Sequence, residues 1–205
     1  SFGQPVTFTA TIGAPGLDLP TGLVTFLDNG TPIGNGTVTN GTARLTIATL
    51  AVGSHPIVAS FAGSGALVGS SASSAAVTQV VVPRSQLTLA KTVDNSGGGT
   101  AAATDWTLSA SGPTPITGAT GSPAVTAASV EAGTYTLAES GPAGYSPSAW
   151  SCSGGLLTGS SLVLAAGQTA SCSITNTFIV SPPSPAILTL AKTVDNSGGG
   201  TAAAT

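Results

Sequence analysis

Apolar and polar residues alternate with a period of two along most of this chain, the pattern of β-strands that have one buried face. In the first part of the chain the alternation fills residues 6–12, 24–26, 43–47, 57–61 and 75–82. Asn-Gly pairs that begin at Asn29, Asn35 and Asn40 separate the earlier runs and favour hairpin turns. No segment has a convincing helical period. The pattern therefore predicts an all-β chain of tandem β-sandwiches with no substantial helix.

A long exact repeat predicts how the chain is divided. The eighteen-residue sequence LTLAKTVDNSGGGTAAAT occupies residues 87–104 and again residues 188–205, an offset of 101 residues. An offset of this size fits a whole small domain rather than a solenoid repeat. The second copy follows a proline-rich stretch that is stiffened toward polyproline II. We expect a sandwich at 1–82, a linker at 83–86, a second sandwich at 87–180, a Pro-rich linker at 181–187, and the first strand and turn of another copy at 188–205.

The composition excludes several classes of function. Only 5% of the 205 residues are charged, with four Lys plus Arg against seven Asp plus Glu and a net charge of -3. Such a chain has no basic surface with which to hold nucleic acid. No apolar run approaches the roughly 20 residues that span a bilayer, so we expect no membrane insertion in this segment. No signal-peptide pattern is present, and we expect any secretion signal or wall anchor to lie outside these residues.

Three polar residues interrupt the apolar faces of their predicted strands. Lys91 alternates in phase with the leucines of its strand, Glu139 with a tyrosine and a leucine, and Asn176 with a cysteine and an isoleucine. An unpaired buried charge costs several kcal/mol, so we expect these side chains to meet one another. Taken singly, each residue has a simpler interpretation. Lys91 could protect an edge strand, Glu139 could be a surface acid beside a turn, and Asn176 could bind a local backbone group.

The first segment contains the sequences GQPVTFTA at 3–10, PTGLVTFLD at 20–28 and LAVGSH at 50–55. In these sequences it resembles the bacterial Ig-like repeat domains of large surface proteins. The resemblance begins late, so we expect the family's first strand to be missing here. Such domains usually have Gly-Asp after the aromatic strand, whereas this chain has Gly63-Ser64, which argues against a metal at that position.

The second segment resembles the prealbumin-like, CnaB-type domains of Gram-positive pilins and adhesins. Lys91, Glu139 within YTLAESGPAGY and Asn176 within ITNT carry this resemblance. It implies that the Lys91 amine attacks the Asn176 amide, releases ammonia and leaves an isopeptide bond, while Glu139 shuttles protons. Burial disfavours both charges, so proton exchange within such a pair gives a neutral amine nucleophile. Lys192 repeats the position of Lys91, and we expect it to be unreacted unless a neighbouring chain supplies an asparagine.

Cys152 and Cys172 are the two cysteines of the chain. In an extracellular protein we expect them to form a disulfide, and the alternative is a pair of buried thiols. Two cysteines and one histidine cannot make a closed zinc site.

The other candidate residues favour structural roles. His55 has no catalytic partners of recognisable spacing, and residues 94–97 predict a turn rather than a calcium site. Trp106 and Trp150 are interpreted as core residues rather than sugar-binding platforms. The three Asn-Gly-Thr sequences are interpreted as hairpin turns rather than glycan sites.

Together these features predict a structural stalk or fibre segment of a secreted bacterial cell-surface protein. Its partners are expected to be neighbouring repeat domains of the same chain. The alternatives are a subunit of an extracellular pilus-like filament, with other copies of the chain as partners, and a ligand-binding adhesin domain. We expect no enzyme activity beyond one autocatalytic cross-linking event per domain, and no cofactor or metal.

Overall fold

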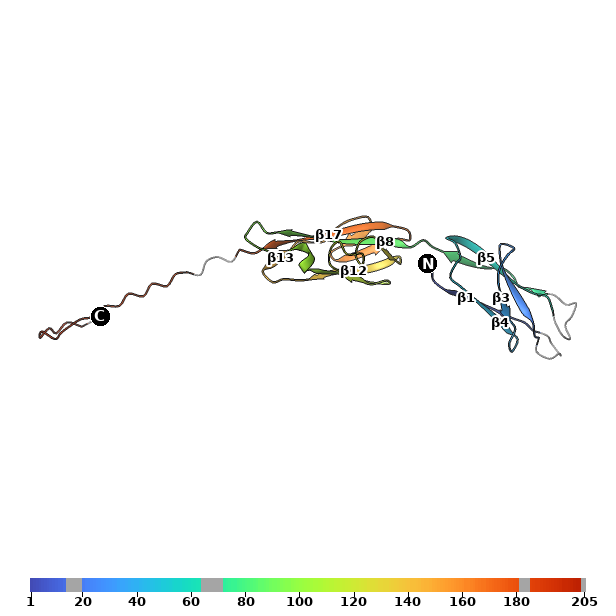
Figure 1. The fold of residues 1–205 in the computed structure, drawn as a ribbon, viewed down its shortest axis with the longest axis horizontal. Helices are drawn as coiled ribbons and strands as arrows, with labels where there is room; N and C mark the ends of the chain where they lie inside the picture. Colours follow the sequence, from blue (N-terminus) through green and yellow to red (C-terminus); the bar gives the residue numbers. More distant parts are fainter. Residues whose placement is uncertain (14–19, 64–71, 181–184, 204–205) are drawn as a thin grey trace.

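The chain folds almost entirely into β-strands, as the alternation predicted (Figure 1). The computed structural model describes residues 1–13, 20–63, 72–180 and 185–203. Within these ranges the one helical element is η2, a three-residue 3-10 turn at Ala103–Asp105. Gly63-Ser64 and the Pro-rich linker lie partly outside the described residues.

The first seven strands form two facing sheets. A two-stranded sheet pairs β1 with β4, and the second sheet has the order β3-β2-β5-β6, with β7 also paired to β5. The strands are β1 (Val6–Thr11), β2 (Leu23–Asp28), β3 (Thr31–Thr37), β4 (Thr42–Ile47), β5 (Gly53–Phe61), β6 (Ala72–Ser73) and β7 (Val77–Val81). Alternate apolar side chains of both sheets meet in a core around Val24, Phe26, Ile57 and Phe61.

Two of the predicted Asn-Gly turns adopt the expected backbone. Asn29 and Gly30 have φ angles of 48° and 83°, and Asn40 and Gly41 have φ angles of 50° and 72°. Positive φ at both central residues is the requirement of a type I′ turn, which matches the twist of the strands it joins. The third pair lies within β3 instead, where Gly36 is buried against the backbone of Arg44. There the glycine makes room for a close approach rather than a turn.

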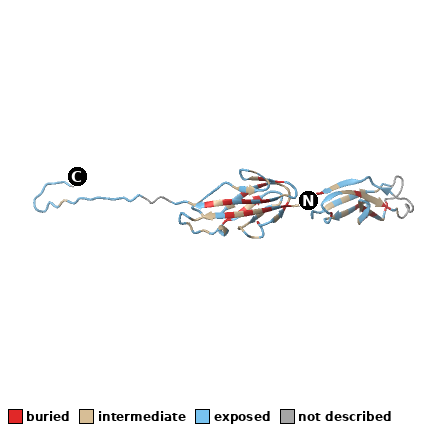
Figure 2. Cartoon of the chain, turned by 90° about the horizontal axis from the view of Figure 1, so that it is seen from above, coloured by how far each residue is buried: buried red, intermediate tan, exposed pale blue. Residues whose placement is uncertain are grey.

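The remaining strands form a second sandwich of two five-stranded sheets. One sheet has the order β10-β9-β12-β16-β15, and the other has the order β11-β8-β17-β13, with β14 also paired to β17. The strands are β8 (Ser85–Asp94), β9 (Thr107–Ser111), β10 (Ile116–Gly118), β11 (Ala128–Val130), β12 (Gly133–Ser140), β13 (Tyr145–Pro147), β14 (Ser151–Ser153), β15 (Leu156–Thr158), β16 (Ser161–Leu164) and β17 (Thr169–Phe178). Buried and exposed residues alternate along its long strands (Figure 2).

The first and last strands of this second sandwich are parallel neighbours. β8 pairs with β17 over nine registered positions, from Gln86 opposite Thr169 to Asp94 opposite Thr177. Because both strands run in the same direction, the chain enters at one end of the sandwich and leaves at the other (Figure 1).

The junction between the sandwiches is short and is bonded to both. Val82 accepts a hydrogen bond from the Phe2 amide at 2.9 Å, which ties the end of β7 to the first sandwich. Arg84 donates to the Ser129 carbonyl at 3.2 Å, and the Ser85 hydroxyl donates to the Ala165 carbonyl at 2.7 Å. The predicted linker at 83–86 is therefore largely absorbed into β8 and its contacts.

The second copy of the repeated sequence forms no strand among its described residues. Leu188 and Leu190 are 92% and 93% exposed, whereas the equivalent Leu87 and Leu89 of β8 are 0% and 1% exposed. The same sequence is thus a strand only where β11 and β17 flank it.

Candidate cross-link site in the second sandwich

Lys91 and Glu139 meet inside the second sandwich from opposite sheets. Lys91 lies on β8, whose inward residues are leucines, and its side chain is 0% exposed. Glu139 lies near the end of β12 with a side chain that is 12% exposed. The Lys91 Nζ donates to Glu139 Oε2 at 2.6 Å, the length of a charge-assisted bond. The pair is therefore an almost fully buried ion pair that bridges the two sheets.

Asn176 lies on β17 beside this pair. Parallel pairing sets Lys91 opposite Ile174 and Asn176 opposite Val93, so Asn176 is the next inward residue along the neighbouring strand. Diagonal neighbours on one face of a sheet are within reach of a long side chain. Asn176 is 3% exposed, and its Oδ1 has no hydrogen-bond partner among the described residues. A buried carbonyl without a donor is costly, which marks this amide as the unsatisfied member of the group.

An indole ring lies next to the lysine. The Lys91 Nζ is 5.1 Å from the centroid of the Trp106 ring, and Trp106 is 2% exposed. Trp106 in turn meets the edge of Tyr145, with ring centroids 5.1 Å apart and planes at 89°. The sequence interpretation of Trp106 as a core residue missed this contact with the charged pair, because alternation shows which face a residue occupies but not its neighbour from another element.

Cys152 and Cys172 form the expected disulfide. They stand directly opposite each other on β14 and β17, and the sulfur atoms are bonded at 1.99 Å. The bond lies four residues before Asn176 on β17 and fastens β14 to that strand. The last strand is thus held covalently to a neighbour on its own sheet.

Comparison with protein families divides the chain between two domain types. Residues 1–82 match the bacterial Ig-like domain (group 3), and residues 83–174 match the prealbumin-like fold domain. The chain joins a bacterial Ig-like domain to a prealbumin-like domain. The second match ends two residues before Asn176. Both resemblances drawn from the sequence are confirmed.

Comparison with solved structures gives distant similarities. The fibronectin(III)-like modules of Clostridium thermocellum CbhA are 15% identical, with 86% of each chain covered and a TM-score of 0.30. The major pilin protein T-13 of Streptococcus pyogenes is 11% identical, with 87% of this chain and 98% of that chain covered and a TM-score of 0.32. The T3.2 major pilin of the same organism is 11% identical, with 87% and 99% covered and a TM-score of 0.28. No curated protein matches the chain.

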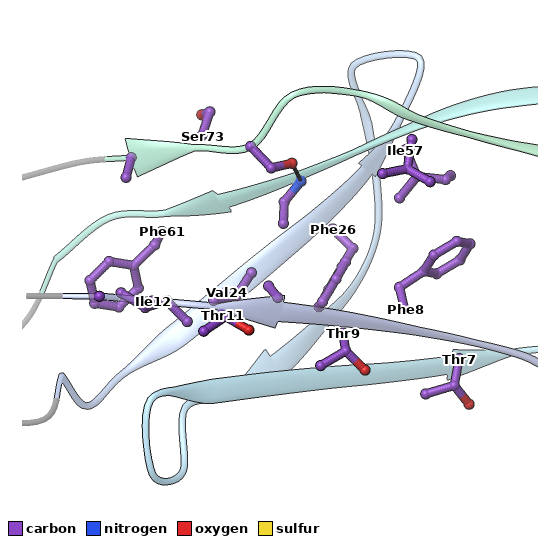
Figure 3. A pocket seen from close by; sticks show the side chains of 16 residues that line it. Thr7, Phe8, Thr9, Thr11, Ile12, Val24, Phe26, Ile57, Phe61 and Ser73 are labelled. Carbon is purple, nitrogen blue, oxygen red and sulfur yellow. Dashed lines mark hydrogen bonds between the residues drawn. The ribbon is translucent and has the colours of Figure 1, made fainter.

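A hollow lies in the Ig-like domain. It has a volume of about 470 Å³ and opens between β1 and the pair β6 and β7 (Figure 3). Phe8, Ile12, Phe26 and Phe61 line it. It has no charged residue in its lining and stands apart from the lysine pair.

The described residues contain neither a cluster of metal-binding side chains nor a helix that could span a membrane. No group of three or more His, Cys, Asp or Glu side chains gathers there in a way that could hold a metal ion. No helix in the described ranges is long and apolar enough to cross a membrane.

His55 of the Ig-like domain has an acidic partner that its sequence position did not reveal. Its Nδ1 lies 2.7 Å from Asp28 Oδ2, and its Nε2 lies 2.8 Å from the Ala51 carbonyl oxygen. Both neighbours are acceptors, so both ring nitrogens are best satisfied as donors. The hydrogen bond to Asp28, followed by that to Ala51, raises the pKa of His55 above 6.5.

We expect this interaction to make the Ig-like domain less stable as the pH rises. A raised pKa in the folded state stabilises the fold fully below the unfolded value of 6.5, and the contribution is lost as the pH rises through the folded pKa. His55 is the one histidine of the chain, so NMR titration of its ring reports this pKa directly. Asp28→Asn should return the pKa toward 6.5 and flatten the dependence of the melting temperature on pH. Equal pKa values in the two proteins would contradict the assignment.

Proposed function

We propose that the chain is an extracellular structural segment of a bacterial surface protein, a stalk or fibre that carries mechanical load. In this proposal Lys91 and Asn176 of the prealbumin-like domain become joined by an isopeptide bond. The observation that carries it is the placement of a buried lysine, a buried acid and an unsatisfied buried amide around the parallel pair of first and last strands.

The chemistry needs no outside reactant. Glu139 takes a proton from the Lys91 ammonium along their 2.6 Å hydrogen bond, which leaves a neutral amine. The amine nitrogen attacks the Asn176 amide carbon, the new C–N bond forms, and the old C–N bond breaks. Glu139 returns its proton to the departing nitrogen, which also receives the proton that the attacking nitrogen loses. Overall, one ammonium and one primary amide give one secondary amide and one ammonium ion, and Glu139 is regenerated.

The strand geometry explains what the bond would do. Load applied along the chain enters at the start of β8 and leaves at the end of β17, so it shears the hydrogen bonds between these two strands. A covalent bond between Lys91 and Asn176 would carry the load from one strand to the other. The domain would then transmit force without unfolding.

The extracellular assignment has separate support. The disulfide between Cys152 and Cys172 is a bond that persists in oxidising compartments. The chain also consists of a bacterial Ig-like domain and a prealbumin-like domain, and the sequences of both resemble domains of bacterial surface proteins. Only 5% of the residues are charged, so the chain has no basic surface that would bind nucleic acid or anionic lipid.

Single-molecule stretching of the full chain tests this function. The Ig-like domain should give one unfolding event, and the prealbumin-like domain should give none. Lys91→Ala should add an event of roughly 250 Å, at about 3.5 Å for each released residue with the disulfide loop still closed. Lys192→Ala is the matched control and should behave as the wild type. Two unfolding events in the wild-type chain would reject the load-bearing role.

A further inference from the structure

Residues 95–101, called here the 95–101 loop, form a compact turn by bonds within themselves. The Asn95 side chain donates to the Ala101 carbonyl at 3.0 Å, and the Gly98 amide donates to the Asn95 carbonyl at 2.9 Å. The Asp94 carboxylate accepts from the Ser96 amide at 2.9 Å and fixes the start of the loop. These bonds give the loop its shape but do not attach it to the sandwich.

The repeat provides a comparison for this loop within the same chain. In the second copy, Asn196 donates to the Ala202 carbonyl at 3.0 Å and Gly199 donates to the Asn196 carbonyl at 3.0 Å. The Asp195 carboxylate likewise accepts from the Ser197 amide, at 2.8 Å. This copy has no sandwich packed on it, since its leucines are exposed. The shape of the loop is therefore set by its own sequence.

What the 95–101 loop has in addition is Tyr145. The Tyr145 hydroxyl donates to Asn95 Oδ1 at 2.7 Å and accepts from the Ala101 amide at 3.0 Å, so one hydroxyl joins both ends of the loop. Gly99 lies directly on this hydroxyl and on Phe178, and a Cβ at Gly99 would overlap both. Tyr145 thus connects a locally formed loop to β13 and β17.

Tyr145 also supports the ring beside Lys91. Its own ring contacts the Trp106 indole edge-on and packs against Phe178 at 5.3 Å between centroids. Gly141, which follows β12, lies so close to the indole that a Cβ would overlap it. Trp106 is therefore fixed by Tyr145 and Gly141, and it lies against the ammonium of Lys91 at 5.1 Å.

We infer that Tyr145 is a positioning residue that attaches the 95–101 loop to the sandwich and keeps Trp106 in place as the cover of the Lys91 and Glu139 pair. The indole of Trp106 then excludes water from the Lys91 amine, whose side chain is fully buried. The effect on the rate of cross-linking rests on the function proposed above, whereas the cover itself does not. Excluding water matters because the proton shared by the pair must go to the departing nitrogen rather than to solvent.

Tyr145→Phe tests this role, because it removes the hydroxyl and keeps the ring. Tyr135→Phe is a matched control, since the Tyr135 hydroxyl also donates to one carbonyl, Glu131 at 2.7 Å, and accepts from one amide, Thr114 at 3.3 Å. Both changes are made in the full chain carrying Trp150→Phe, so that Trp106 is the one fluorescent tryptophan. Three quantities are measured: quenching of Trp106 by acrylamide, hydrogen exchange of the Ala101 amide, and the rate of ammonia loss, followed by intact mass after cell-free synthesis.

Tyr145→Phe should increase the quenching of Trp106 and speed exchange of the Ala101 amide about tenfold. It should also slow ammonia loss about tenfold without abolishing it. Tyr135→Phe should change exchange at Thr114 and leave Trp106 and Ala101 as in the parent.

Two outcomes separate this inference from the proposed function. Unchanged quenching and Ala101 exchange in Tyr145→Phe would overturn the positioning role, even if the cross-link forms normally. A parent chain that never loses ammonia would reject the cross-link, and the first two measurements would still decide whether Tyr145 maintains the cover.

Discussion

Replacing Lys91 with alanine is expected to preserve the side-chain amide of Asn176, which the wild-type protein loses as ammonia. The same change should destabilise the prealbumin-like domain by about 4 kcal/mol. The wild-type bond would close a loop from Lys91 to Asn176 and so restrict the unfolded chain. The variant also leaves the mostly buried Glu139 without the nitrogen of Lys91 as a hydrogen-bond donor. Intact mass measures the first effect, and urea unfolding measures the second.

Two further variants sharpen this result. Lys192→Ala removes the same residue from the same sequence, but from a segment that is exposed, so mass and stability should not change beyond the substitution itself. Glu139→Gln keeps the lysine and the asparagine and should retain the ammonia because the proton carrier is gone. A wild-type mass equal to that of the unmodified sequence would refute the cross-link.

Removal of the disulfide by the double change Cys152→Ala and Cys172→Ala is expected to destabilise the prealbumin-like domain by about 3 kcal/mol in the loop-entropy model. The bond closes a sequence separation of 20 residues and fastens β14 to β17. Urea unfolding with and without reductant measures the effect. The reductant should weaken the wild type to a similar extent and should not affect the double variant. A wild type that unfolds identically under both conditions would contradict a stabilising role.

The alternation of apolar residues predicted most of the fold because each long strand has one buried face. The outward serines and threonines of β17 and its inward Cys172 and Ile174 follow this rule along the whole strand. The rule also holds for Lys91, since a residue in phase with Leu87 and Leu89 must share their face. The second copy marks its limit, because the same leucines are exposed where no neighbouring strands cover them.

Contacts between elements were harder to predict. His55 contacts Asp28 because β2 and β5 are adjacent strands, with Asp28 opposite Ile57. The sequence of either strand alone does not predict this pairing. Trp106, the residue before β9, contacts Lys91, and Tyr145 contacts Asn95 across 50 residues of sequence. Such contacts depend on the register of paired strands and on which strands of the two sheets face each other. The alternation of apolar residues predicts neither.

The parallel arrangement of β8 and β17 also sets how a repeated array grows. The prealbumin-like domain admits the chain at one end and releases it at the other, so a following domain of this type would be joined at the far end. The repeat offset of 101 residues would then correspond to the length of one domain and its linker. An array of such domains would have a length set by the number of its copies.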